Sequence, residues 1–137
     1  MTSEERREIR YQRRKAKRDE ARLKRSMACG DFDEVFSFRH LYLSAKKCCK
    51  GVYWKSSTQR YISNLIPNIS ETLLSLRNGT FIHRGFHEFY IMERGKKRHI
   101  RSVHISERTV QKCLCDYCIV PIYSASFIYD NSASLKH

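Results

Sequence analysis

Long apolar runs are missing from this sequence of 137 residues, and its first residues contain no apolar core. A membrane-spanning helix needs about 20 consecutive apolar residues, and a signal peptide needs a shorter apolar stretch after a charged start. The chain starts with Met1-Thr2-Ser3-Glu4-Glu5, which is typical of neither a membrane-spanning helix nor a signal peptide. We therefore expect a cytoplasmic protein with no membrane partner, and in that compartment the six cysteines are expected to be reduced thiols.

Acidic residues are scarce, because 14 Asp and Glu oppose 27 Lys and Arg and leave a formal net charge of +13. Such an excess of positive charge indicates a polyanionic partner. Eleven basic and five acidic side chains lie in residues 1–25. A hydrophobic content of 41% still permits a small core. The sequence therefore predicts a basic helical extension, residues 1–28, followed by one small domain, residues 29–137.

Signatures of an autonomous catalytic centre are missing as well. The 5 glycines form no phosphate-binding loop of the Gly-x-x-x-x-Gly-Lys-Ser/Thr type, and no Cys/His spacing indicates a nucleophile. The carboxylates beyond residue 30 are scattered, and Asp31 and Asp33 are typical of turn and capping positions before a helix. We expect no catalytic residue in this chain.

The cysteines leave a metal site as an alternative. Cys115-x-x-Cys118 has the separation of half a zinc site, and Cys48, Cys49 or His104 could complete it. No second Cys-x-x-Cys exists, so we favour buried free thiols that pack as small hydrophobic side chains, with no metal ligand among them.

Residues 3–27 are mostly Arg, Lys, Glu, Gln and Ala, which favour a helix, but few of them are apolar. This segment is predicted to project as a charged helix that grips the backbone of a nucleic acid, and a merely solvated helix is the alternative. The basic residues that would contact nucleic acid are Arg6, Arg7, Arg10, Arg13, Arg14, Lys15, Lys17 and Arg18.

Helical periodicity recurs in three segments of the domain. Ser37 is the expected N-cap of a helix that runs to about Lys50. Apolar positions at spacings of three and four predict a second helix over residues 57–78, with a kink or brief break at Pro67. Ser106 is the expected N-cap of a third helix, which carries Val110 and Leu114 on its apolar side and ends before Pro121.

Strand-like composition lies between the second and third of these helices, in residues 80–82, 86–92 and 98–103, and again near residue 127. The pair 86–92 and 98–103 is predicted to form a β-hairpin with a basic tip. The fold class is thus expected to be α+β, with helices packed around a β-hairpin and a projecting basic N-terminal helix.

Basic and aromatic residues alternate through the hairpin, an arrangement suited to phosphate and to nucleic-acid backbones. A hairpin kept soluble by Lys and Arg at its edges is the alternative. The expected nucleotide- or phosphate-binding residues are Arg94, Lys96, Lys97, Arg98 and Arg101.

Two stretches carry a family resemblance: Arg94-Gly95-Lys96-Lys97-Arg98-His99-Ile100-Arg101, and Ile105-Ser106-Glu107-Arg108-Thr109-Val110-Gln111-Lys112. Together they resemble the fingers region of bacterial and phage reverse transcriptases of the group II intron, retron and diversity-generating kinds. The family pattern is a Gly-Lys-x-Arg turn and strand, then an acidic-Arg-x-x-Gln helix start, then a Pro before a Phe that leads into a polar loop. Pro121 and Phe127 follow in that order, and the resemblance covers about residues 30–136.

The resemblance implies a fingers subdomain of a right-hand polymerase fold, in which Arg98 would contact the triphosphate. The preceding Lys of related enzymes has only Arg94 as an approximate counterpart. The Tyr-x-Asp-Asp loop of the palm, which binds Mg²⁺ in the complete family enzyme, does not occur in this sequence. We therefore expect an N-terminal part of an RNA-directed DNA polymerase that binds an RNA template or an RNA/DNA duplex, without polymerising alone and without a cofactor of its own. A separate chain could supply the palm. The competing hypothesis is a self-sufficient small basic nucleic-acid-binding protein without enzymatic activity.

Overall fold

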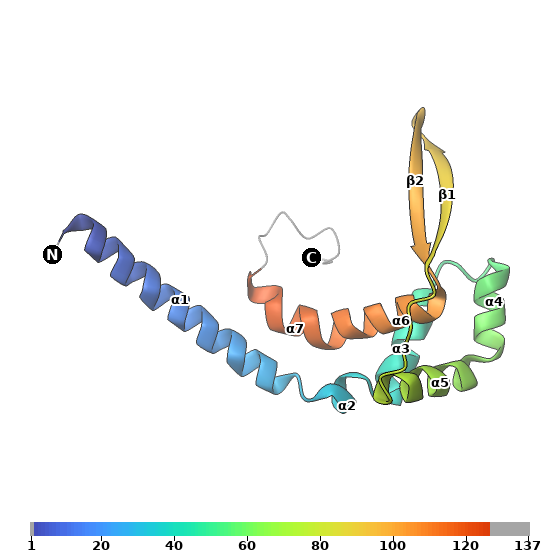
Figure 1. Cartoon of the computed structure of the whole chain (residues 1–137), viewed down its shortest axis with the longest axis horizontal. Coiled ribbons are helices and arrows are strands. Elements are labelled where there is room, and N and C mark those ends of the chain that lie inside the picture. Colours follow the sequence, from blue (N-terminus) through green and yellow to red (C-terminus); the bar gives the residue numbers. More distant parts are fainter. Residues whose placement is uncertain (1, 127–137) are drawn as a thin grey trace.

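The computed structural model describes residues 2–126 and shows an α+β fold, mostly helical, with a two-stranded antiparallel hairpin (Figure 1). The α-helices are α1 (Ser3–Ala28), α2 (Phe32–Val35), α3 (Phe38–Cys49), α4 (Ser56–Ser63), α5 (Leu65–Arg77), α6 (Ile105–Leu114) and α7 (Val120–Tyr123). A π-helical turn, η1 (Cys115–Ile119), links α6 to α7, and a short 3-10 turn, η2 (Ser124–Ser126), follows α7. The strands are β1 (Phe86–Glu93) and β2 (Lys96–Val103). Among the described residues, no helix is long and apolar enough to cross a membrane.

Helix α1 projects from the rest of the molecule and contains no buried residue, which confirms the predicted charged helix (Figure 1). A capping box begins it, because the Thr2 side chain accepts from the Glu5 N–H while the Glu5 carboxylate accepts from the Thr2 N–H. Only its last turn is docked, where the Arg25 guanidinium donates to the Ile122 carbonyl of α7. Helix α1 is therefore attached to the rest of the molecule at its C-terminal end and projects from it.

The core lies where α3, α5 and α6 meet. Leu41 and Ala45 of α3, Ile69 of α5 and Cys113 of α6 are fully buried. The predicted N-cap of α3 is confirmed, since the Ser37 side chain accepts from the His40 N–H. Ala45 and Cys113, one on each helix, are small side chains, which favours close packing of α3 against α6.

The predicted helix over residues 57–78 is divided into α4 and α5 by Asn64 (φ −120°, ψ 36°). The break lies just upstream of Pro67, which occupies the first turn of α5. The reason is physical: a proline ring clashes with the carbonyl four residues earlier, here that of Ser63 at the end of α4, whereas a first-turn residue needs no N–H donor.

Helix α6 begins differently from the prediction. His104, and not Ser106, is the N-cap, because its side chain accepts from the Ser106 N–H. The expected apolar face is confirmed only in part: Val110 packs against the core, but Thr109 and Cys113 are the buried positions and Leu114 is exposed. Packing against the small residues of α3 selects compact side chains here over the larger leucine.

The helical path does not end before Pro121 as predicted, but continues through the wide turn η1 into α7. In η1 the Val120 N–H bonds to the Cys115 carbonyl, five residues back. Pro121 has no N–H for the Tyr117 carbonyl, and that carbonyl instead accepts from the Cys29 thiol. The missing donor is thus replaced by a residue just beyond α1, which ties the root of α1 to this turn.

The hairpin stands out from the helices, so the expectation that helices pack around it is wrong (Figure 1). Every residue of β1 is exposed. The strands pair from Phe86↔Val103 to Glu93↔Lys96, with Arg94 (φ 49°) and Gly95 (φ 76°) as the turn. Two consecutive positive φ angles define a type I′ turn, which matches the twist of the strands. Residues 80–82 are not a strand, and the strand expected near residue 127 lies outside the described residues.

Candidate nucleic-acid interface

The register of the hairpin separates its side chains onto two faces, because side chains alternate along a strand. One face, the Tyr90 face, carries Tyr90 and Met92 of β1 opposite His99 and Lys97 of β2, with Glu88 and Arg101 nearer the foot. The other, the Phe89 face, carries Phe89 and Ile91 opposite Ile100 and Arg98. The predicted basic residues are therefore divided between two faces of one ribbon.

The Tyr90 face combines a stacked ring pair with a cation. The Tyr90 and His99 rings stack with centroids 4.8 Å apart, and the Lys97 ammonium lies 4.3 Å from the Tyr90 centroid. Tyr90 remains 61% exposed. An exposed ring flanked by positive charge is the arrangement that holds an unpaired base and its phosphate in single-stranded nucleic-acid sites.

The five predicted phosphate-binding residues of the hairpin are all exposed but differ in their partners. Arg98 pairs with Glu93 (Nε to Oε2, 2.9 Å), and Arg101 pairs with Glu88 (Nε to Oε1, 2.8 Å). Arg94 and Lys96, beside the tip, form no ion pair with any residue from 2 to 126. The tip therefore carries the charge most available to an external anion, whereas Arg98 must first leave a carboxylate.

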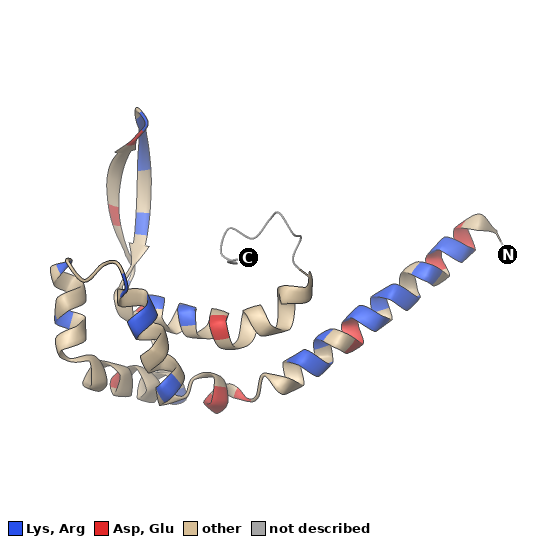
Figure 2. Ribbon diagram, turned by 180° about the vertical axis from the view of Figure 1, so that it is seen from behind, with Lys and Arg blue, Asp and Glu red and all other residues tan. Residues whose placement is uncertain are grey.

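Basic residues recur along the whole length of helix α1 (Figure 2), and the helical repeat distributes the predicted ones unevenly around its axis. At about 100° per residue, Arg6, Arg10, Arg13 and Lys17 form one stripe, and Arg7, Arg14 and Arg18 form the adjoining stripe. The opposite side holds Glu4, Glu8, Asp19 and, among the predicted residues, Lys15. Seven of the eight predicted residues share one broad face, and Lys15 does not belong to it.

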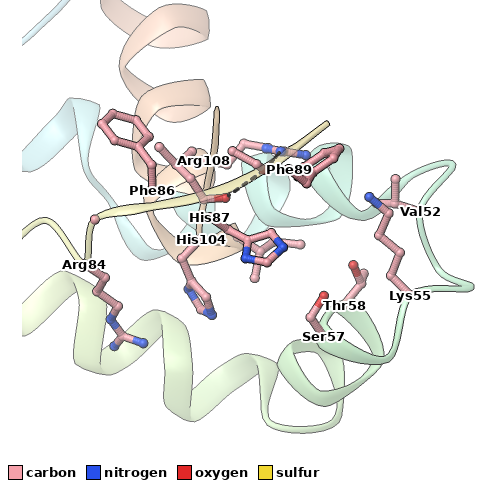
Figure 3. A pocket seen from close by; sticks show the side chains of 14 residues that line it. Val52, Lys55, Ser57, Thr58, Arg84, Phe86, His87, Phe89, His104 and Arg108 are labelled. Carbon is pink, nitrogen blue, oxygen red and sulfur yellow. Dashed lines mark hydrogen bonds between the residues drawn. The ribbon is translucent and has the colours of Figure 1, made fainter. Parts of the chain in front are cut away.

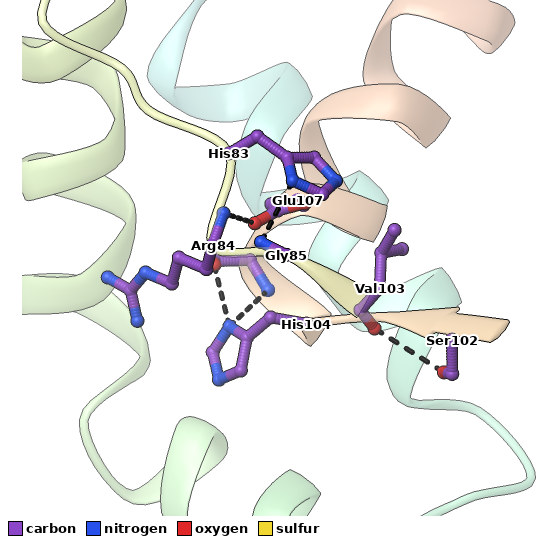
Figure 4. Close-up of polar contacts among 8 residues, drawn as sticks. His83, Arg84, Gly85, Ser102, Val103, His104 and Glu107 are labelled. Carbon is purple, nitrogen blue, oxygen red and sulfur yellow. Dashed lines mark hydrogen bonds and ion pairs between the residues drawn. The ribbon is translucent and has the colours of Figure 1, made fainter. Parts of the chain in front are cut away.

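The foot of the hairpin is fastened to α6 by Glu107 (Figure 4). This carboxylate is 3% exposed, accepts the backbone N–H of Arg84 (2.6 Å) and lies 3.2 Å from Nε2 of His83. Since Glu107 is in the first turn of α6, its negative charge is also stabilised by the helix dipole. The segment that leads into β1 is therefore held to the N-terminus of α6 and not by strand pairing.

A basic pocket of about 730 Å³ opens at this foot, between β1, the start of α4 and the start of α6 (Figure 3). Its lining includes three cationic side chains, two histidines and two hydroxyl groups from α4, and no acidic side chain; they are Lys55, Arg84, Arg108, His87, His104, Ser57 and Thr58. We call it the foot pocket.

His104 contributes a donor to the foot pocket in a defined tautomer. Its Nδ1 accepts from the Ser106 N–H, which places the proton of the neutral ring on Nε2. Burial and then the charge of Arg84 lower the pKa of His104 below its usual value, although Glu107 acts in the opposite direction. The lowered pKa favours the neutral ring, which offers an N–H at Nε2 and not a second acceptor.

Sequence reasoning identified the tip residues but did not assemble the foot pocket. Lys55, His87 and His104 come from three separate elements, so no local motif unites them. The basic composition of residues 84–108 indicates an anion-binding region. It does not indicate that Lys55 lines the same cavity as Arg84 and Arg108.

The six cysteines are free thiols, of which Cys49 and Cys113 are buried and Cys115 is exposed. Burial raises the pKa of Cys113 to about 11, and its thiol donates to the Val35 carbonyl. The prediction of buried thiols is thus confirmed for two of the six. Within residues 2–126, no three His, Cys, Asp or Glu side chains form a group that could hold a metal ion.

Comparison with known proteins adds no relative: no protein-family model matches the chain, and no curated protein matches it significantly.

Proposed function

We propose that this chain binds RNA through the hairpin and the basic face of α1, as the fingers part of an RNA-directed DNA polymerase. The observation that carries the proposal is the hairpin itself: an exposed ribbon with Arg94 and Lys96 at its tip and the Tyr90 ring stacked on His99 beside Lys97. Phosphates would pair with the tip cations, and an unstacked base would lie on Tyr90.

The polymerase part of the proposal rests on the resemblance of residues 94–112 to reverse-transcriptase fingers. Two placements in the molecule support it. The resembling residues form one continuous unit, from the hairpin tip to the first turns of α6, and Glu107, the acidic residue of the helix-start pattern, secures the foot of that unit. Nucleotidyl transfer needs metal-binding carboxylates that these residues do not provide, so a palm from another segment or chain would perform it.

A self-sufficient RNA-binding protein is the second candidate. It is favoured by a hydrophobic core that this chain buries without a partner chain. Leu41, Ala45 and Ile69 are fully buried by this chain alone. The exposed Leu114, Ile119 and Tyr123 on the α6 to α7 path favour the first candidate, because a palm would cover such a face.

Two measurements test these proposals. Fluorescence anisotropy with a labelled single-stranded RNA should show binding that Lys96→Gln weakens, and absence of RNA binding would refute both candidates. Thermal unfolding with analytical ultracentrifugation distinguishes them: a cooperative transition of a monomer favours the self-sufficient protein, whereas self-association through the α6 to α7 face favours the fingers part. Primer extension on an RNA template with magnesium should give no incorporation by this chain alone.

A further inference from the structure

The foot pocket is chemically distinct from the hairpin surface, because it is concave and its charge is unbalanced. Lys55, Arg84 and Arg108 bring three permanent positive charges to its lining, and no Asp or Glu lines it. By contrast, two of the hairpin arginines already face carboxylates. The nearest carboxylate, Glu107, lies beside the pocket and is already bonded to the Arg84 N–H, so an anion that enters the pocket meets a lining of positive charge.

The donors in the foot pocket surround a space from several sides. The rings of His87 and His104 face the hydroxyl groups of Ser57 and Thr58 across it (Figure 3). Arg84 has no ion pair within the described residues, whereas Arg108 donates to the Ser102 hydroxyl at the rim. No side chain caps α4, so the free N–H groups of its first turn add partial positive charge on the side of Ser57.

We propose that the foot pocket binds the terminal phosphate of a nucleic-acid strand. An internal phosphodiester carries one negative charge and continues in both directions, so it suits an open surface such as the hairpin. A terminal phosphate carries up to two negative charges near pH 7 and has three oxygen acceptors, and the strand stops at it. It therefore suits a concave site with several donors. The aromatic ring of Phe89, which also lines the pocket, would contact the last nucleoside.

This inference rests on the proposed RNA binding for its choice of a strand end as ligand. A free nucleoside triphosphate has the same terminal chemistry and is the other possible source of the phosphate. Both ligands would place a terminal phosphate in the foot pocket, and the experiment distinguishes the RNA strand end from the free triphosphate.

The test compares two RNAs of identical sequence, one with a 5′-phosphate and one with a 5′-hydroxyl, at constant ionic strength. We expect the phosphorylated RNA to bind about tenfold more tightly, the value of about one charge-assisted hydrogen bond. In Arg84→Gln and Lys55→Gln, this preference should fall to about twofold or less, while binding of the 5′-hydroxyl RNA changes little. Equal affinity of the two RNAs for the unaltered chain would overturn the proposal.

Two controls make the result specific. Arg60→Gln neutralises an exposed arginine of α4 that does not line the pocket, and it should leave the preference intact. Lys96→Gln, at the hairpin tip, should weaken both RNAs equally. If Arg84→Gln also weakens both equally, the pocket supplies only general charge and the proposal fails. Circular dichroism verifies that each variant is folded.

Competition by ATP identifies the source of the phosphate. If the 5′-phosphate preference exists and millimolar ATP abolishes it without displacing the 5′-hydroxyl RNA, the pocket accepts either source. If the preference persists under ATP, the pocket requires a strand end. If ATP binds in the wild type but no RNA preference exists, the strand-end proposal is wrong, whereas loss of 5′-hydroxyl RNA binding would refute the proposed function instead.

Discussion

The backbone N–H of Arg84 donates to the buried carboxylate of Glu107 across 2.6 Å, and this bond joins the entrance of the hairpin to the first turn of α6. Removing a buried acceptor leaves its donor unsatisfied, which costs about 1–3 kcal/mol. We therefore expect Glu107→Ala to lower the free energy of unfolding by about that amount. Denaturant unfolding measures it, and amide exchange of Arg84 should accelerate.

Glu71→Ala is the matched control for that variant, since Glu71 is an exposed glutamate on α5 with no ion pair to any residue from 2 to 126. It should change stability by less than about 0.5 kcal/mol. Similar losses in the two variants would show that Glu107 has no special role at the hairpin foot.

The stability of the fold should decrease below neutral pH because of His104. Its pKa is lowered in the fold, mainly by burial and next by Arg84, so the unfolded chain takes up a proton first as the pH falls. The stability from the neutral ring is fully present above the usual pKa of about 6.5 and is lost as the pH falls through that value and the lower folded one. Protonation of Nδ1 would also remove the N-cap bond to Ser106.

His104→Asn should reduce this pH dependence, since asparagine caps a helix and does not titrate. The groups around His104 are Arg84, Glu107, His83 and His87, and all of them remain in the variant. Denaturant unfolding at pH 7 and pH 5 provides the comparison, and an equally steep loss in the variant would assign the effect to the other groups.

Arg94 occupies a left-handed position that a non-glycine residue other than Asn or Asp adopts at a cost. Arg94→Asn creates Asn-Gly, the preferred pair for a type I′ turn, and should stabilise the hairpin by about 0.5–1 kcal/mol. The same change removes a tip charge, so RNA affinity should decrease. A decrease in stability together with affinity would contradict the assignment of a conformational cost to Arg94 at this turn position.

Lys17 and Lys15 provide a matched pair on α1, two residues apart but on opposite sides of the helix. Lys17→Gln removes a charge from the basic face and should weaken RNA binding several-fold at low salt. Lys15→Gln removes an identical charge from the acidic side and should have a clearly smaller effect. Equal effects would mean that α1 acts through its net charge, without a defined contact face.

Local rules predicted those parts of the fold in which one residue determines the geometry. Ser37 caps α3 as expected, and Gly95 completes the hairpin turn. The errors arise where a distant residue intervenes. Pro121 lies in the first turn of α7, and the Tyr117 carbonyl, for which it has no N–H, accepts from the Cys29 thiol, far away in sequence. Such compensation has no local signal.

In the candidate site, too, the local features could be predicted from the sequence and the contacts between distant elements could not. The exposed basic tip follows from composition and alternation within one hairpin. The sequence could not indicate that Glu93 and Glu88 would neutralise Arg98 and Arg101, because cross-strand pairing depends on the register. Nor could it bring Lys55 to the hairpin foot, since that contact depends on how α4 packs beside β1.

The salt dependence of RNA affinity tests the central claim most directly. The unaltered chain should lose affinity steeply as salt rises, with a log-log slope of about −0.7 for each phosphate neutralised on a single strand. The double variant Lys96→Gln/Lys97→Gln should give a slope shallower by about one to two, because two phosphate contacts are removed. A flat dependence for the unaltered chain, or an unchanged slope in the double variant, would contradict the claim that the hairpin binds nucleic-acid phosphates.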